Sequence, residues 1–277
     1  MRVAWVTDSS VHQIKQLDDI YIVPISINVN GETYYDGIDI GQEKIYELIK
    51  QDNMEIKTSQ PSIGAFVDVY RECEQHYDHI ISIHLSSKLS GTYYTAVQAS
   101  SFVNIPITII DSNVLSYPLL DLILYGKKLQ EKGASVETIK ERLEARIPHN
   151  EAYVMVGNLG QLHKSGRIKG LTFFLGSMLN IKPVLSIEAG EIIVKNRVRS
   201  KARGLKQMTS FLQKALEEAT IQHAWIFHGK NETEARKWRE ALTERFPEVS
   251  FLTCPIGTVL SVHAGEELIG ISWYKEG

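Results

Sequence analysis

The chain has 277 residues, of which 43% are hydrophobic and 23% charged, a composition typical of a globular protein with room for two ordinary domains. The net charge of −3 argues against a nucleic-acid partner or a strongly anionic membrane surface. Cys73 and Cys254 are too far apart for a disulfide framework or a zinc site. The sequence opens on a strand pattern without a secretory signal, and no apolar run reaches the roughly 18 residues that cross a bilayer, so we expect a cytoplasmic protein.

The first half alternates short apolar runs with stretches in which apolar residues recur every three or four positions. These patterns predict strands over residues 2–6, 21–27, 79–85 and 107–110, and helices over residues 64–77, 93–102 and 119–132. A further helix is expected from Ser135, a good N-cap, to about residue 148. Strand–helix alternation predicts a parallel sheet covered on both faces.

The pattern changes after Pro148-His149-Asn150, which indicates a domain boundary. Two strands, residues 181–187 and 191–199, are joined by the hairpin signal Glu188-Ala189-Gly190. A helix over 200–218, a strand over 224–228, a helix over 232–246 and two final strands follow. The second half is therefore predicted to be a mixed α+β domain.

The segment Leu85–Thr92 is the most informative candidate site, because it joins an apolar strand to a helix. Ligands of open α/β sheets bind at the carboxyl ends of strands, and a helix N-terminus suits an anion. Gly91 allows close approach to the backbone, and Ser90 and Thr92 supply hydroxyl donors. A plainer interpretation of equal weight is that Ser90 is only the N-cap of the helix.

Two further loops carry hydroxyl groups. In Thr58-Ser59-Gln60-Pro61-Ser62, Pro and Ser are ordinary helix-start signals, and that interpretation is favoured. In Thr7-Asp8-Ser9-Ser10, Asp8 stands where a phosphoryl-transfer nucleophile would, but Ser10 occupies the place of the second acid. We therefore interpret Asp8 as a residue that fixes the loop.

A serine hydrolase is the alternative class of function. Ser90, His263 and Asp111 could form a triad on paper, but the GxSxG elbow is absent from the sequence. The sequence also has no HExxH motif and no P-loop, so neither a metal nor a cofactor is expected. The basic residues between Arg197 and Lys206 fit a solvated hairpin and helix start, whereas Arg167, in Gly166-Arg167-Ile168, has no evident structural duty.

Eight short segments, in this order, resemble the DegV family. They are Thr7-Asp8-Ser9, Tyr34-Tyr35-Asp36-Gly37, Thr58-Ser59-Gln60-Pro61-Ser62, Leu85-Ser86-Ser87-Lys88-Leu89-Ser90-Gly91-Thr92-Tyr93, Ile110-Asp111-Ser112, Gly166-Arg167-Ile168, Ile181-Lys182-Pro183-Val184 and Gly257-Thr258-Val259 before His263. The resemblance implies two dissimilar domains: residues 1–149 as a three-layer α/β/α domain with a parallel sheet, and residues 150–277 as an α+β domain with a mixed sheet.

The resemblance further implies a long-chain fatty acid in an apolar tunnel at the domain interface. Thr58, Ser90 and His263 would hold its carboxylate, with Ser59, Gly91 and Thr92 at the same site. The candidate tunnel walls, which ordinary core packing would explain equally well, are Phe173, Phe174, Leu175, Met178, Leu179 and Ile181.

By the same resemblance the protein is a carrier without catalytic activity. It would present the buried acid to a separate fatty-acid kinase that makes the acyl phosphate, with Arg167 in the partnership. Transient contact with a membrane is compatible with that role.

The C-terminal turn departs from the family pattern. The family usually has His-x-Gly-Pro-Gly, whereas this chain has His263-Ala264-Gly265-Glu266-Glu267. Carboxylates beside His263 would favour its imidazolium form and would repel an anionic ligand. We expect both acids to face solvent, where their charges are screened.

Overall fold

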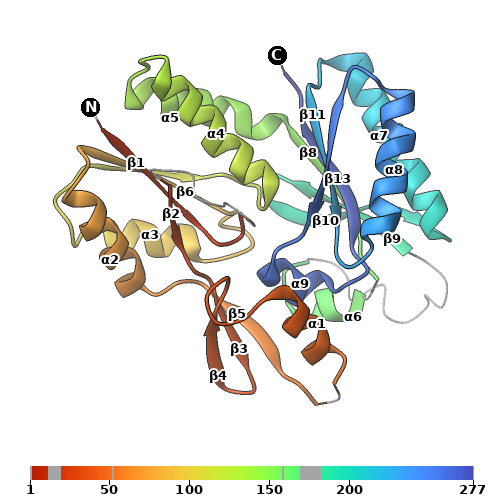
Figure 1. Ribbon diagram of the computed structural model, residues 1–277, viewed down its shortest axis with the longest axis horizontal. Coiled ribbons are helices and arrows are strands. Elements are labelled where there is room, and N and C mark those ends of the chain that lie inside the picture. Colours follow the sequence, from red (N-terminus) through yellow and green to blue (C-terminus); the bar gives the residue numbers. More distant parts are fainter. Residues whose placement is uncertain (1, 12–19, 52, 158, 169–181, 277) are drawn as a thin grey trace. The chain divides into compact units, whose positions relative to one another are not determined.

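A computed structural model of the chain describes residues 2–11, 20–51, 53–157, 159–168 and 182–276. It divides into two compact units, Met1–Pro148 with Gly257–Val262, and His149–Ile256 with His263–Gly277. The first contains a parallel sheet and the second a mixed sheet, which confirms the predicted α/β class (Figure 1). The short segment Gly257–Val262 belongs with the first unit although it lies late in the chain.

The first unit is built on a four-stranded parallel sheet of order β2-β1-β6-β7. Its strands are β1 (Val3–Asp8), β2 (Ile20–Val23), β6 (His79–His84) and β7 (Ile107–Asp111). Its helices are α2 (Ile63–Glu74), α3 (Thr92–Ser100), α4 (Tyr117–Glu131) and α5 (Val136–Arg146). The predicted N-cap of α5 is confirmed, because the Ser135 side chain accepts from the Thr138 N–H.

Alternation along β1 produces the three layers of this unit. Ala4 and Val6 join the core formed with α2 and α3, whereas Trp5 points to the opposite face, against α4. The Trp5 indole Nε1–H donates to Gln130 Oε1 of α4 at 2.7 Å. Because successive side chains of a strand face opposite sides, one apolar run buries itself against both helical layers.

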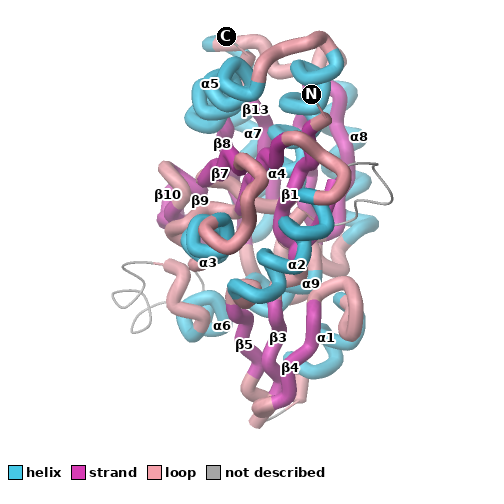
Figure 2. Tube along the Cα trace, turned by 90° about the vertical axis from the view of Figure 1, so that its left-hand side faces the viewer, coloured by secondary structure: helices cyan, strands magenta, loops and turns pink. Residues whose placement is uncertain are grey.

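A separate antiparallel sheet of order β4-β3-β5 also belongs to the first unit (Figures 1 and 2). It comprises β3 (Ser26–Val29), β4 (Glu32–Tyr35) and β5 (Ile56–Ser59), and helix α1 (Gln42–Ile49) lies between β4 and β5 in the chain. The prediction of one strand over residues 21–27 is wrong, because the run divides into β2 and β3 around Pro24. Proline has no N–H for a ladder, and the Ile25 N–H donates to Ser9 Oγ instead.

The second unit contains a six-stranded sheet of order β10-β9-β8-β13-β11-β12, in which β11 and β12 are parallel and the other neighbours antiparallel. Its strands are β8 (Asn150–Met155), β9 (Lys182–Glu188), β10 (Glu191–Val198), β11 (His223–His228), β12 (Ser250–Pro255) and β13 (Ile269–Tyr274). Its helices are the 3-10 turn η1 (Ile147–His149, which begins in the first unit), α6 (Leu159–Lys164), α7 (Lys201–Glu218) and α8 (Glu232–Arg245). Helix α9 (Thr258–Ala264) begins in the first unit and ends in the second.

One face of the mixed sheet is buried against α7 and α8. Alternate residues of β13, Ile269, Ile271 and Trp273, share a core with residues of both helices, including Met208 and Trp238. The predicted β9–β10 hairpin is confirmed, with the two turn residues Ala189 and Gly190 both at positive φ. Within the described ranges, no helix is long and apolar enough to span a membrane.

Gly126 of α4 tests the packing of the central layer. A Cβ there would lie 2.2 Å from Trp5 Cη2. Although Ala is the better helix former, we expect Gly126→Ala to lower the free energy of unfolding by about 1–3 kcal/mol through overpacking. Urea denaturation measures this. Gly64→Ala is the matched control, because its Cβ would meet nothing closer than Ser62 Oγ at 3.8 Å. Equal stability of both variants would contradict the packing argument.

Candidate functional site

The strand order of the four-stranded sheet defines the position of the candidate site. From β1 the chain proceeds to β2 on one side and later to β6 on the other, so the order reverses between β1 and β6. In open α/β sheets ligands bind at the carboxyl ends of the strands beside such a reversal. The loops that follow β1 and β6, residues 9–11 and 85–91, therefore border the expected site.

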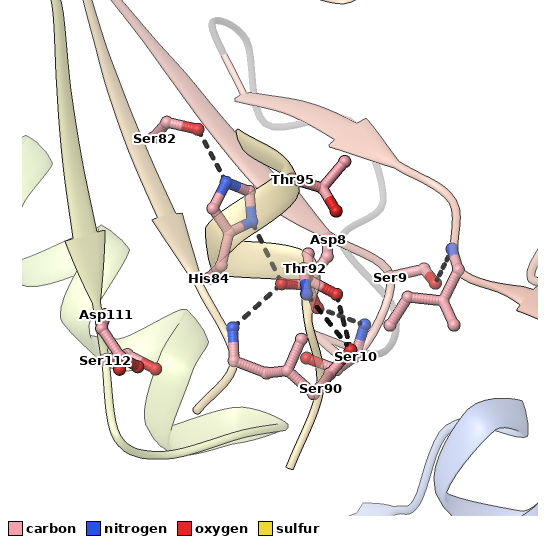
Figure 3. Close-up of polar contacts among 12 residues, drawn as sticks. Asp8, Ser9, Ser10, Ser82, His84, Ser90, Thr92, Thr95, Asp111 and Ser112 are labelled. Atoms are coloured by element: carbon pink, nitrogen blue, oxygen red, sulfur yellow. Dashed lines mark hydrogen bonds and ion pairs between the residues drawn. The ribbon is translucent and has the colours of Figure 1, made fainter. Parts of the chain in front are cut away.

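Asp8 joins the ends of these two strands (Figure 3). Its Oδ2 accepts from the Leu85 N–H at 2.9 Å and contacts His84 Nδ1 at 3.1 Å, and its Oδ1 accepts from the Ser10 N–H at 3.1 Å. The side chains of Asp8 and His84 are both fully buried. These contacts confirm Asp8 as the residue that fixes the loop.

A chain of buried polar groups continues from Asp8 into the core. His84 Nε2 lies 2.7 Å from Ser82 Oγ, which lies 2.8 Å from the Tyr70 hydroxyl. A neutral imidazole protonated on Nδ1 satisfies every contact: Tyr70 donates to Ser82, Ser82 to His84 and His84 to Asp8. Burial raises the pKa of Tyr70 well above its usual value, so its hydroxyl keeps its proton.

This series of buried polar groups has the connectivity of a catalytic triad, but a substrate cannot reach it. Asp8, His84, Ser82 and Tyr70 each have 0% of their surface exposed. Ser82 also already uses its hydroxyl to contact both His84 and Tyr70. The arrangement therefore holds β1, β6 and α2 together and is not suited to nucleophilic attack.

The segments 58–62 and 90–92 lie against each other through Gln60. Its Nε2–H donates to Thr95 Oγ1 of α3 at 3.3 Å. A Cβ at Gly91 would stand 2.4 Å from Gln60 Oε1. The side-chain amide of Gln60 thus takes the space beside Gly91, and close approach of a ligand to this backbone stays a prediction. Ser62 is the N-cap of α2, accepting from the Ala65 N–H at 3.1 Å, as the favoured interpretation of its loop predicted.

Ser90 is not the N-cap of α3, so that alternative is wrong. The N-cap is Gly91, which has no side chain to offer. Ser90 Oγ instead pairs with Thr92 Oγ1 at 2.8 Å and accepts weakly from the Thr92 N–H at 3.4 Å. Ser90 is half-buried and Thr92 fully buried. Thr58 is half-buried and Ser59 exposed on β5, which pairs with β3.

Three buried hydroxyl groups at the carboxyl edge of the sheet have no hydrogen-bond partner in the described part of the protein. They belong to Thr7 and Ser10, at the end of β1, and to Ser116, between β7 and α4. Buried polar groups are normally met by ordered water or by a ligand. Ser116, which lies at φ +60°, carries no motif signal and was missed from the sequence. The edge is therefore richer in unused donors than the sequence indicated.

The Asp111 side chain fixes the loops that follow β6 and β7. Its Oδ1 accepts from the Ser87 N–H at 3.0 Å and the Asn113 N–H at 3.3 Å, which links the ends of β6 and β7. This duty accounts for Asp111 without a triad.

His263 and Arg167 both belong to the second unit. Burial, and then the positive charge of Arg167, lowers the pKa of His263 to about 4, so its imidazole is neutral at pH 7. The imidazolium form considered from the sequence is thus disfavoured. Glu267 is exposed, with its side chain against Gly157, and Glu266 is half-buried.

The remaining candidates are accounted for as follows. Phe173, Phe174, Leu175, Met178, Leu179 and Ile181 lie outside the described residues. Arg199, Arg203 and Lys206 are exposed, as expected of a solvated hairpin and helix start. Within the described residues, no group of three or more His, Cys, Asp or Glu side chains could hold a metal ion.

Substitution of Ser82 tests whether the buried series of hydrogen bonds stabilises the fold. Ser82→Ala leaves His84 Nε2 and the Tyr70 hydroxyl without their common partner, so we expect a loss of about 2–4 kcal/mol in the free energy of unfolding. Adding Tyr70→Phe should cost less than the sum of the single changes, because it removes one orphaned group. Urea denaturation of the three variants checks this, with the exposed Ser101→Ala as control. If Ser82→Ala lowers the free energy of unfolding by less than about 0.5 kcal/mol, these buried hydrogen bonds do not stabilise the fold.

Comparison with known proteins adds relatives over the full length. The family described as "Uncharacterised protein, DegV family" matches residues 2–276. The protein DegV of Bacillus subtilis is 33% identical over 278 residues, covering 99% of each chain. The crystal structure of that fatty-acid-binding protein superposes with a TM-score of 0.90 at 32% identity, covering 100% of both chains. A fatty-acid-binding DegV family protein from Thermus thermophilus superposes with a TM-score of 0.91 at 29% identity, again over 100% of both chains.

The agreement in sequence and fold over the whole chain points to the same family as the short motifs. The two loops at the reversal point of the sheet, including Asp8 and the Ser90-Gly91-Thr92 turn, belong to the segments on which the resemblance rested. The chain is a member of the DegV family.

Proposed function

We propose that this protein binds a long-chain fatty acid and presents it to a separate fatty-acid kinase, without catalysing a reaction itself. The observation that carries the proposal is the match, over the whole chain, to two solved DegV proteins that bind fatty acids. A third relative, from Eubacterium ventriosum, binds stearic acid and superposes with a TM-score of 0.85 at 25% identity.

The carboxylate is proposed to bind Thr58, Ser59, Ser90, Gly91, Thr92 and His263. What supports Ser90, Gly91 and Thr92 is their position after β6, at the edge of the parallel sheet used for ligands. What supports Thr58 and Ser59 is that their segment lies against this turn through Gln60. The N-terminus of α3 adds backbone N–H groups and the positive end of its dipole. A neutral His263 can still donate one N–H to an anion.

The apolar tail would supply most of the affinity. Burying about 14 methylenes at about 0.8 kcal/mol each contributes on the order of 11 kcal/mol before association entropy, which removes several kcal/mol. A dissociation constant near micromolar or tighter is consistent with the remainder. Desolvating the carboxylate costs several kcal/mol, and each hydrogen bond to it returns about 1.5–3 kcal/mol. The polar site would thus orient the acid.

A serine hydrolase remains the competing class. The contacts of Ser90 favour the carrier, because its hydroxyl lies 2.8 Å from Thr92 Oγ1, which is not a base. Among the described residues of the first unit, the imidazole bonded to a serine is that of His84, and its serine is the buried Ser82.

Lipid extraction and acyl-ester turnover distinguish the carrier from the hydrolase. The purified protein should release a long-chain fatty acid on solvent extraction, identified by mass spectrometry, and should not turn over acyl esters. Ser90→Ala should weaken fatty-acid binding by about tenfold, which is about 1.4 kcal/mol, through loss of one donor to a carboxylate. Ser101→Ala, at the C-terminal end of α3, is the control. Stoichiometric labelling of Ser90 by a fluorophosphonate, or ester hydrolysis abolished by Ser90→Ala, would establish the hydrolase.

A further prediction concerns Arg167, the residue proposed to contact the fatty-acid kinase. Arg167→Ala should leave fatty-acid occupancy unchanged but suppress acyl phosphate formation when kinase and ATP are supplied, and added salt should weaken the same reaction. Lys164→Ala, which removes an exposed charge three residues away, is the control. Because the Arg167 charge already reaches His263, a loss of occupancy in Arg167→Ala would instead assign it to the carboxylate site.

A further inference from the structure

Ser10 carries a hydroxyl group that the protein encloses without using. The residue is 0% exposed, and within the described residues its Oγ meets no hydrogen-bond partner. Its backbone is fixed in a turn, because the Ser10 N–H donates to Asp8 Oδ1 at 3.1 Å and the Val11 N–H donates to the Asp8 carbonyl at 3.4 Å. A buried hydroxyl without a partner is unfavourable. The position of Ser10 therefore suits an acceptor that is itself buried, such as an ordered water or the head group of a bound lipid.

Asp8 also connects Ser10 to the turn that carries Ser90. Asp8 Oδ2 accepts from the Leu85 N–H at 2.9 Å. From there the chain turns back on itself, and the Ser90 N–H donates to the Ser86 carbonyl at 3.1 Å. In the view of Figure 3, Ser10 and Ser90 lie on the same side of the Asp8 carboxylate. One buried carboxylate thus fixes the backbone beside both hydroxyl groups.

Thr92 decides the direction of the Ser90 proton. Thr92 is fully buried, and among the described residues its hydroxyl meets Ser90 Oγ at 2.8 Å, so Thr92 donates to Ser90 if its own proton is to be bonded. Ser90 Oγ also accepts from the Thr92 N–H at 3.4 Å. Because both groups donate to it, Ser90 directs its own proton away from Thr92, and its side chain is only half-buried. Ser90 therefore offers one hydrogen bond to a ligand.

A single hydroxyl donor is too few for a buried carboxylate. Such a head group has two oxygens that accept about four hydrogen bonds, and burying its charge is unfavourable unless donors replace its water. The first turn of α3 contributes backbone N–H groups, which have no partner inside a helix. The negative charge of Asp8 opposes an anion nearby, which raises the need for donors at this place. Ser10, at the end of the strand next to β6, supplies a further hydroxyl.

We propose that Ser10 donates a hydrogen bond to the carboxylate of the fatty acid, beside Ser90, and so helps to select an ionised acid over a neutral lipid. The inference rests on the proposed function and adds one residue to its carboxylate site. A hydroxyl donor binds an ionised carboxylate about twice as strongly as it binds a neutral group. Loss of this donor therefore lowers the affinity for an acid more than the affinity for an alcohol of the same chain length.

Competition binding to the full-length, delipidated protein tests this assignment. Oleic acid and oleyl alcohol, which have the same chain length and double bond, are each used to displace the fluorescent fatty acid cis-parinaric acid at about pH 7.5. Ser10→Ala should weaken the binding of oleic acid by about fivefold to tenfold and that of oleyl alcohol by less than about twofold. The exposed Ser101→Ala is the control and should change neither affinity.

Two further measurements separate hydrogen bonding from packing. In Ser10→Cys the thiol occupies nearly the same space as the hydroxyl but is a weak donor, so this variant should lose as much affinity for oleic acid as Ser10→Ala. In urea denaturation without lipid, Ser10→Ala should be at least as stable as wild type, because it removes a buried hydroxyl that has no partner. Affinity and stability would then change in different directions, which a purely structural role of Ser10 does not produce.

Other results would overturn the inference. Unchanged binding of oleic acid to Ser10→Ala, or wild-type affinity in Ser10→Cys, would show that the hydroxyl does not donate to the carboxylate. Lower stability of Ser10→Ala together with equal losses for both ligands would assign the hydroxyl to an enclosed water that holds the loop. If wild type binds oleic acid no more tightly than oleyl alcohol, or binds neither saturably, the carboxylate site of the proposed function fails, whatever the variants of Ser10 do.

Discussion

The buried contact between Asp8 and the end of β6 is the interaction on which the candidate site depends. One carboxylate holds the Leu85 N–H, the Ser10 N–H and the His84 imidazole, so the loops after β1 and β6 share a common anchor. Burying a carboxylate is unfavourable unless hydrogen bonds replace its water, and here three donors do so. Leaving a buried charged group without its donor costs more than the value of about 1–3 kcal/mol typical of a neutral group. The loops can therefore present hydroxyl groups in a defined arrangement.

The same design recurs around the edge of the sheet. Polar side chains with local structural duties keep neighbouring loops in register: Gln60 against Gly91, Asp111 across the ends of β6 and β7, and Ser9 against the Ile25 N–H. Each is tied to at least one neighbouring segment, whereas the hydroxyls of Thr7, Ser10 and Ser116 remain unused within the described protein. An edge with fixed loops and spare donors suits recognition of an anionic head group. Ser82, the serine that contacts His84, is fully buried and is not placed for nucleophilic attack on a substrate.

Several elements follow from local sequence alone. The apolar run Val3–Val6 predicts a central strand, and its alternation decides that Trp5 faces one helical layer while Ala4 and Val6 face the other. Ser62 and Ser135 predict helix starts because a hydroxyl can accept a nearby backbone N–H without help from distant residues. The order of strands and helices predicted the parallel sheet, and the hairpin at Ala189-Gly190 followed from its turn residues.

Which residues form hydrogen bonds with one another was decided by the tertiary structure. Nothing local indicates that Asp8 meets His84, 76 residues away, or that Gln42 and Tyr46 of α1 meet Ser261 of α9. Pro24 divides an apolar run that otherwise predicts one strand, and only the neighbouring Ser9 shows where the Ile25 N–H is satisfied. Hydrophobic periodicity reports which face of an element is buried, because burial acts on every apolar side chain in the same way. A hydrogen bond depends on the distance and direction between two specific atoms, so its partners are determined only when the fold brings distant segments together.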